Sequence, residues 1–174
     1  MTTSRTLLVA LAIAGTGAAV SLGAVTAGGG ATHARATIVD TTGAEVGFAT
    51  FTEDATGALH VNVKVAGVAP GEHGIHIHAV GACTPSFAAA GSHHNPLGAL
   101  HGAHAGDLPN LIVNTAGKGR LNAGTRSASL SAGPVSVFDT DGAAIVIHAL
   151  PDDFVTQPTG GSGDRIACGV ITVG

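Results

Sequence analysis

Histidine is the most informative residue type in this sequence of 174 residues, which contains ten histidines. His76 and His78 flank one isoleucine, and side chains two residues apart on a strand share a face, so both imidazoles point the same way. His148 ends a separate apolar run and can present a third imidazole. The segment 81–110 adds further candidate metal ligands, namely His93, His94, His101, His104 and Asp107.

These residue types are typical of a protein metal site. Neutral imidazole binds zinc and copper, a carboxylate among imidazoles suits zinc, and four nitrogen ligands with an open approach favour a redox copper. Two other interpretations stay open. An H-x-H pair is often only the polar face of a strand, and scattered loop histidines can form a low-affinity surface binder. Six histidines and one aspartate at strand ends and in one long loop favour the specific site.

The elements that must position these side chains are predicted to be β-strands. Apolar and polar residues alternate strictly from Leu59 to Val65, as in a strand with one buried face. Short runs separated by glycine-containing turns continue along the chain, and they predict an all-β antiparallel sandwich or barrel of seven or eight strands. Segments 81–110 and 149–165 resist strand assignment, and loops of that length are usually functional. The predicted strands cover residues 46–52, 59–65, 75–80, 111–114, 119–123, 144–148 and 166–173.

The N-terminal segment 1–36 has the pattern of a secretory signal peptide. Arg5 precedes an apolar run and then small residues. Candidate cleavage sites follow Ala27 and Ala36, and the alternative is an uncleaved membrane anchor. We therefore expect a domain over residues 37–174 that is exported to a periplasm, a cell envelope or the extracellular medium.

Export changes the meaning of the two cysteines, Cys83 and Cys168. Oxidising compartments favour a disulfide, and two cysteines allow one intramolecular pairing. A bridge across their 85-residue separation would stabilise the fold by roughly 4–5 kcal/mol in the chain-entropy model. The alternative is a pair of buried free thiols.

The charge balance limits the classes of partner. Seven Lys and Arg against eleven Asp and Glu give a formal net charge of −4. Nucleic acid and anionic membranes both require clustered basic charge, so neither is expected as a partner once the signal peptide is removed. Trp and Tyr are absent, which leaves no aromatic platform for stacking bases. A monomer and a homodimer are both compatible with the sequence.

Four motifs resemble those of the copper/zinc superoxide dismutase family. GEHGIHIH at 71–78 resembles its copper-ligand signature, and AGSHHNP at 90–96 resembles its bridging-histidine motif. His101 with HAGDL at 104–108 resembles the zinc loop, and GDRIACGVI at 163–171 resembles the C-terminal signature. The motifs follow the family's order from about residue 36 to the end. The resemblance implies an eight-stranded antiparallel Greek-key sandwich or barrel of immunoglobulin-like type with two long functional loops.

The resemblance also implies a role for each candidate residue. His93 would bind both metals through its two ring nitrogens, in an imidazolate form that two divalent ions make accessible. Asp152 would orient one copper ligand and one zinc ligand. Arg165 would flank copper and attract an anion, and a Cys83–Cys168 bridge would tie the metal loop to the sandwich. Copper would be held by His76, His78, His93 and His148, and zinc by His93, His101, His104 and Asp107.

The activity implied by this resemblance is the dismutation of superoxide to dioxygen and hydrogen peroxide at a redox copper beside a structural zinc. His93 would help to deliver a proton. Segment 149–165 contains no lysine, so Arg165 is expected to attract the anion almost alone. The alternative is an exported copper-handling or metal-buffering protein without turnover, and the complete ligand set favours the enzyme. His73 is expected to be a structural hydrogen-bonding residue, and His94 is expected to lie behind the ligands or at the surface. His60 is expected to be solvated on the polar face of a strand, and His33 precedes the expected start of the mature chain.

Overall fold

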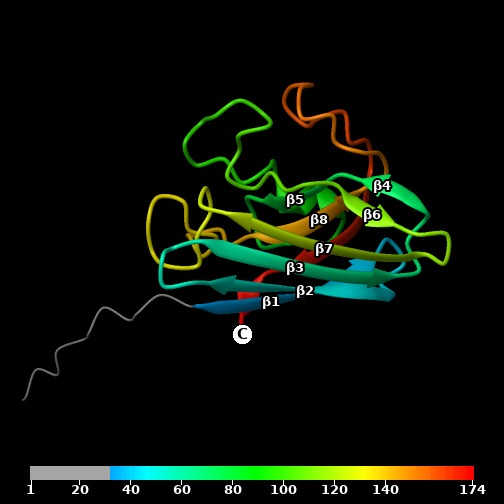
Figure 1. Ribbon diagram of the computed structural model, residues 1–174, viewed down its shortest axis with the longest axis horizontal. Helices are drawn as coiled ribbons and strands as arrows, with labels where there is room; N and C mark the ends of the chain where they lie inside the picture. Colours follow the sequence, from blue (N-terminus) through cyan, green and yellow to red (C-terminus); the bar gives the residue numbers. More distant parts are fainter. Residues whose placement is uncertain (1–31) are drawn as a thin grey trace, which may run out of the picture.

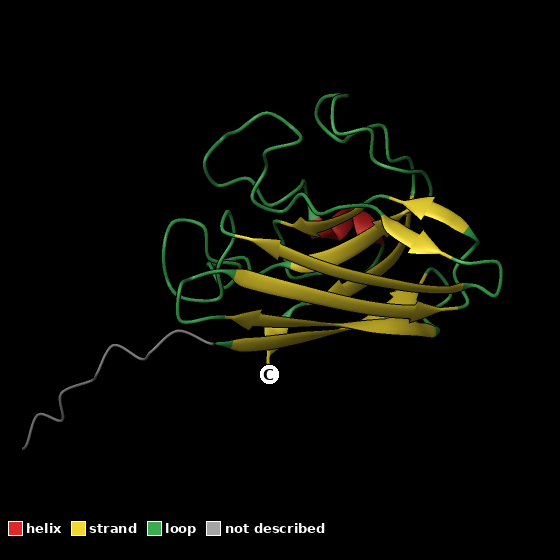
Figure 2. Ribbon diagram, in the orientation of Figure 1, coloured by secondary structure: helices red, strands yellow, loops and turns green. Residues whose placement is uncertain are grey.

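The computed structural model describes residues 32–174 as an antiparallel β-barrel (Figure 1). The predicted signal peptide lies almost entirely outside the described residues. Within them one short 3-10 turn, η1, is the only helical element (Figure 2), and no helix is long and apolar enough to cross a membrane. The strands are β1 His33–Asp40, β2 Glu45–Glu53, β3 Leu59–Ala66, β4 Gly71–His73, β5 Ile75–His78, β6 Leu111–Val113, β7 Lys118–Thr125, β8 Ala144–His148, β9 Arg165–Val170 and β10 Thr172–Val173, and η1 is Phe87–Ala90.

The order of the strands explains how the barrel closes. The hydrogen-bonded path runs β4-β6-β7-β3-β2-β1-β9-β8-β5, and β3 pairs with β7 rather than with the next strand in the chain. The two ends of this path, β4 and β5, are separated in sequence only by Gly74. One extended segment therefore passes from one edge of the sheet to the other. Ile171 alone separates β9 from β10, so the ten strands form eight extended segments, as predicted.

Alternating burial places the core inside this barrel. In β3 every second side chain is buried, beginning with Leu59, which matches the alternation in the sequence. In β5 and β8 every residue is buried. Ile75 and Ile77 enter the core, while His76 and His78 have the opposite parity and lie outside the barrel wall. Their burial must therefore come from the long loops that cover this part of the wall.

β1 is an element that the sequence reasoning did not identify. Residues 33–38 alternate between exposed and buried, and Ala34, Ala36 and Ile38 enter the core. β1 pairs with β2 on one side and with β9 and β10 on the other. The fold therefore includes residues 33–36, upstream of the expected domain start at residue 37.

The disulfide between Cys83 and Cys168 is present, with the two Cα atoms 5.8 Å apart. Cys168 lies in β9, and Cys83 lies in the loop that follows β5. A small second cluster of buried side chains forms here outside the barrel, where Ala90 and Val146 pack with Cys168. The bridge fixes the first long loop, residues 81–110, against β9, which pairs with the histidine-bearing strand β8.

Replacement of Gly74 by alanine is expected to destabilise the barrel where β4 passes into β5. A Cβ atom at this position would lie 2.5 Å from Ser162 Oγ and 2.9 Å from Ser162 Cβ, so the second long loop would have to shift. We expect Gly74→Ala to lower the free energy of unfolding by about 1–3 kcal/mol, measured by denaturant titration. Gly133→Ala is the control, because a Cβ there meets open space. Equal stability of the two variants would contradict this account of Gly74.

Candidate metal centre

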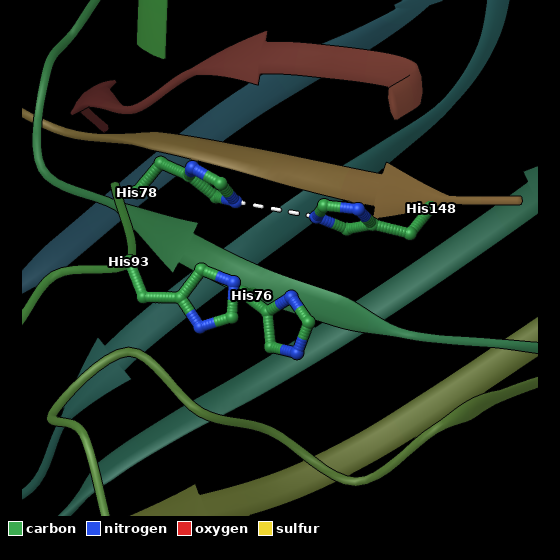
Figure 3. Close-up of side chains that lie close together, drawn as sticks. All are labelled: His76, His78, His93 and His148. Atoms are coloured by element: carbon green, nitrogen blue, oxygen red, sulfur yellow. Dashed lines mark hydrogen bonds between the residues drawn. The ribbon is translucent and has the colours of Figure 1, made fainter. Parts of the chain in front are cut away.

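Four imidazoles from three parts of the chain meet on the outer wall of the barrel (Figure 3). β5 supplies His76 and His78, the end of β8 supplies His148, and the first long loop supplies His93. One ring nitrogen from each residue lies within 4.8 Å of the others, and all four side chains are buried. The structure thus brings together the four residues that the sequence predicts as copper ligands.

Backbone carbonyls orient two of these rings. His78 Nδ1 donates to Gly91 O at 3.0 Å, and His148 Nδ1 donates to Gly163 O at 3.1 Å. The opposite nitrogens, Nε2 of His78 and Nε2 of His148, face each other at 3.3 Å (Figure 3). In this tautomer each Nε2 carries a lone pair, so both rings present a ligand atom to the same point.

A second group forms around Asp107. Its Oδ2 accepts hydrogen bonds from the amides of Gly102 and His104, at 2.8 and 3.0 Å. These bonds aim its Oδ1 at three imidazoles: Nδ1 of His93 lies 3.0 Å away, and Nδ1 of both His101 and His104 lies 3.4 Å away. These four residues are the predicted zinc ligands, and they offer three nitrogens and one carboxylate oxygen.

His93 belongs to both groups. Its Nδ1 faces Asp107, while its Nε2 is buried and has no hydrogen-bond partner among the described residues. Its ring stacks on that of His76, with centroids 3.9 Å apart. One imidazole thus lies between two clusters of ligand atoms, with a different nitrogen available to each.

Asp152 connects the two groups from behind. Its Oδ2 accepts from His76 Nε2 at 2.7 Å, and its Oδ1 accepts from His101 Nε2 at 2.8 Å. Its side chain and both imidazoles are inaccessible to solvent. The carboxylate therefore fixes the tautomers of His76 and His101, and it leaves the Nδ1 atom of each ring free to face the other members of its ligand group.

Two residues that the sequence analysis missed hold this arrangement. Asn110 accepts the backbone N–H of Asp152 at 2.8 Å and donates to its carbonyl at 3.0 Å. Gln157 accepts the backbone N–H of His101 at 2.7 Å and donates to its carbonyl at 3.2 Å. Both side chains bind backbone atoms of distant residues, so no local pattern in the sequence signals their role.

Burial sets the charge state of the centre. It lowers the pKa of His76 to about 3, of His78 to about 2 and of His148 to about 4, with further lowering from neighbouring His93. These imidazoles are therefore neutral at physiological pH, as metal binding requires. Burial opposes ionisation of Asp107, but hydrogen bonds from His93 and from backbone amides outweigh it and lower the pKa to about 2. Negative carboxylates among neutral imidazoles favour a bound cation.

The ligand atoms fit metal ions on a simple test. Buried polar atoms normally have partners, because an unpaired one retains its desolvation cost. Among residues 32–174, three buried side-chain polar atoms have none, and all three belong to this centre: His76 Nδ1, His93 Nε2 and His101 Nδ1. Copper and zinc both accept the donor sets that surround these atoms.

A cavity of about 300 Å³ opens onto the first group, lined by His78, His93, His148 and Arg165 among others. Arg165 is half-buried, and its guanidinium donates to Phe87 O and Gly91 O, each at 2.6 Å. It makes no ion pair with the neighbouring Asp164. A larger hollow of about 830 Å³ lies along the disulfide loop and contains no histidine. The smaller cavity is therefore the approach to the metal centre.

The other histidines lie outside both groups. His73 is buried between two carbonyls, with Nδ1 2.8 Å from His148 O and Nε2 2.9 Å from Ala69 O, which agrees with a structural role. His94 is buried with Nε2 3.3 Å from Val135 O. His60 is exposed and pairs with Asp54, and His33 is exposed at the start of β1.

Comparison with known proteins agrees with this geometry. The family model for copper/zinc superoxide dismutase matches residues 45–171. The Cu-Zn superoxide dismutase of Deinococcus radiodurans is 40% identical over 156 residues, covering 79% of this chain and 82% of that protein. The enzyme of Caulobacter vibrioides is 40% identical over 139 residues, covering 74% and 79%. A solved structure of a mutant superoxide dismutase-like protein from Bacillus subtilis is 37% identical, covers 78% of this chain and 95% of that chain, and has a TM-score of 0.74.

These comparisons, together with the two groups of clustered potential ligands, identify the class as a metal-dependent oxidoreductase. The chain belongs to the copper/zinc superoxide dismutase family. Its activity is the dismutation of superoxide to dioxygen and hydrogen peroxide, and its cofactors are copper and zinc.

Removal of the Asp152 carboxylate is expected to weaken metal binding without touching a ligand. Asp152→Ala leaves His76 and His101 without the acceptor that fixes their rings. We expect zinc affinity to fall about 10–100-fold, measured by competition with a chelating dye. Asp153→Ala is the matched control, because that carboxylate accepts hydrogen bonds only from within its own turn, from the amides of Val155 and Thr156 and from the Thr156 hydroxyl. An unchanged affinity in Asp152→Ala would show that the rings do not depend on this carboxylate.

Proposed function

We propose that His76, His78, His93 and His148 hold the copper of this superoxide dismutase and that His93, His101, His104 and Asp107 hold its zinc. The observation that carries this proposal is the position of His93, whose two ring nitrogens face the two different groups. The types of ligand atom indicate which group holds which metal. The carboxylate lies in only one group, which suits zinc, and the open cavity is lined by three of the four histidines in the other group together with Arg165, which suits a redox copper.

The protein residues contribute positioning and charge to the reaction. Copper held by the four histidines would supply one-electron redox chemistry, and the overall reaction converts two superoxide ions and two protons into dioxygen and hydrogen peroxide. Arg165 places a cation at the cavity beside His148 and His78. A guanidinium stays protonated even where burial lowers its pKa, as it does here. His93 can hold a proton at Nε2, the nitrogen on the side of the four-histidine group.

The cavity favours a small anion. Arg165 is the only Lys or Arg that lines it, and its two hydrogen bonds to carbonyls of the disulfide loop fix the guanidinium in place. The disulfide in turn holds this loop against β9, which carries Arg165. We propose that a diatomic anion is drawn to this fixed cation, because no other positive side chain competes for it at the cavity.

Every proposed ligand comes from one chain, so we propose that activity does not require a second copy. We also propose that the protein is exported and that its signal peptide is removed before β1. Cleavage after Ala36 would delete half of β1 and the core residues Ala34 and Ala36, whereas cleavage after Ala27 leaves the strand intact. The disulfide supports an oxidising compartment, such as a periplasm, a cell envelope or the extracellular medium.

Substitution of His148 separates the two proposed sites. His148→Ala removes a ligand from the four-histidine group and leaves all four zinc ligands in place. We expect superoxide dismutase activity to be lost while about one zinc per chain remains, measured by a superoxide assay together with metal analysis. His60→Ala, an exposed histidine, should retain both activity and metals. Full activity in His148→Ala would contradict the copper assignment, and copper and zinc without activity in the unaltered protein would support the metal-buffering alternative.

Substitution of Arg165 tests the attraction of the anion. We expect Arg165→Ala to lower activity about tenfold at low ionic strength, with a smaller loss at high salt, because salt screens charge–charge attraction. Arg165→Lys keeps the charge and should recover part of the activity. Arg126→Ala removes an exposed cation that binds Thr56 and should have little effect. Unchanged activity of Arg165→Ala at low salt would contradict this role.

The mass of the exported protein tests the proposed processing. We expect intact-mass spectrometry to give a chain that begins at Gly28 and lacks two hydrogens because of the Cys83–Cys168 disulfide. Reduction and alkylation should then modify both cysteines. A chain that begins at Thr37, or one that retains residues 1–27, would contradict the proposed cleavage.

A further inference from the structure

Three cations gather on the outer face of the barrel, on strands β3 and β7. Lys64 lies directly opposite Arg120 in the antiparallel pair, and Lys118 lies two residues before Arg120 on the same face. All three side chains are exposed. They are half of the Lys and Arg residues in the described chain, which are Arg35, Lys64, Lys118, Arg120, Arg126 and Arg165.

No acidic side chain compensates this cluster. Every ion pair among residues 32–174 involves a histidine, so Lys64, Lys118 and Arg120 have no carboxylate within ion-pair distance. On the sheet, the acid closest in register is Glu72, which lies beyond Ile112. Like charges directly opposite each other on a sheet destabilise it. Lys64 and Arg120 therefore repel each other without a neighbouring carboxylate, although the chain has more acidic than basic residues.

The cations surround a hollow. A depression of about 540 Å³ is lined by Lys64, Lys118 and Arg120 together with Ile112 and Asn114. Phe48 lies on the far side of Lys64, and its ring centroid is 5.6 Å from Lys64 Nζ, which restrains the lysine by a cation–π contact. The lining thus contains one guanidinium and two ammonium side chains, and Ile112 on the neighbouring strand β6 adds an apolar side chain.

We propose that this hollow binds an oxyanion of the phosphate class through Lys64, Lys118 and Arg120. The Arg120 guanidinium can donate two parallel hydrogen bonds to two oxygens of a tetrahedral oxyanion. The ammonium groups of Lys64 and Lys118 can then balance the remaining negative charge of the anion. A doubly charged anion also removes the repulsion between Lys64 and Arg120. A singly charged diatomic anion offers fewer acceptors than these three groups have donors.

The site is separate from the metal centre. In the order of the sheet, β2, β1 and β9 lie between β3 and β8, and Figure 1 shows β3 and β7 on the near side of the barrel, in front of β5 and β8. The cavity at Arg165 shares no residue with this hollow. A phosphate group bound here would leave the approach to copper open.

Titration of inorganic phosphate at constant ionic strength tests the proposal. The reduced, metal-loaded protein is diamagnetic, so backbone amides of Lys118 and Gly119 can be followed by NMR. We expect saturable shifts with a dissociation constant of about 1 mM. The double variant Lys64→Gln/Arg120→Gln should weaken binding about 25-fold, about fivefold for each cation. The control is the double variant Arg35→Gln/Arg126→Gln, which has the same net charge as Lys64→Gln/Arg120→Gln. It should bind phosphate as tightly as the unaltered protein does.

The outcomes decide both the site and the source of the phosphate. Equal weakening in the two double variants would overturn the proposal, because net charge alone would then explain binding. Absence of saturable shifts at Lys118 and Gly119 would overturn it as well. Cosedimentation with phosphatidylglycerol vesicles but not phosphatidylcholine vesicles, lost only in Lys64→Gln/Arg120→Gln, would support the site and assign the phosphate to a lipid headgroup. Phosphate binding without cosedimentation would support a soluble phosphate.

Discussion

A single buried carboxylate, Asp152, connects the two halves of the metal centre. Its two oxygens accept N–H groups from His76 and His101, which belong to different ligand groups and lie on β5 and in the first long loop. Asp152 itself lies in the second long loop and is held by Asn110. A movement of the second long loop would therefore change the orientation of an imidazole in each ligand group. The centre is one hydrogen-bonded unit in which the ring orientations depend on each other.

The barrel supplies the rigid surface on which this unit forms. Gly74 joins β4 to β5, the two strands at the ends of the hydrogen-bonded path, and its carbonyl accepts the backbone N–H of His148 at 2.8 Å. The residue at which the barrel closes therefore also holds the backbone of a proposed ligand. The disulfide fixes the first long loop, whose carbonyls orient both His78 and Arg165. Neutral imidazoles, ionised carboxylates and one fixed guanidinium are thus all set by contacts between loops and strands that are distant in sequence.

Much of the fold and of the centre could be predicted because the relevant signals are local. Strand parity places His76 and His78 on one face and their isoleucine neighbours on the other, and the structure confirms this. β1 was missed for an instructive reason. Its Ala34-Arg35-Ala36 segment resembles a signal cleavage site, yet the same alternation of small and polar residues is that of a half-buried strand. Asn110 and Gln157 were missed because their partners are backbone atoms of remote residues. The composition likewise gives the number of Lys and Arg residues, but it could not show that folding brings Lys64, Lys118 and Arg120 together.

The shared imidazole of His93 is the central feature of this account, and a crystal structure of the metal-loaded protein with anomalous data at the copper and zinc edges tests it most directly. We predict copper among His76, His78, His93 and His148, zinc among His93, His101, His104 and Asp107, and opposite nitrogens of His93 directed at the two ions. A single occupied site, or two ions of which His93 contacts only one, would contradict the account.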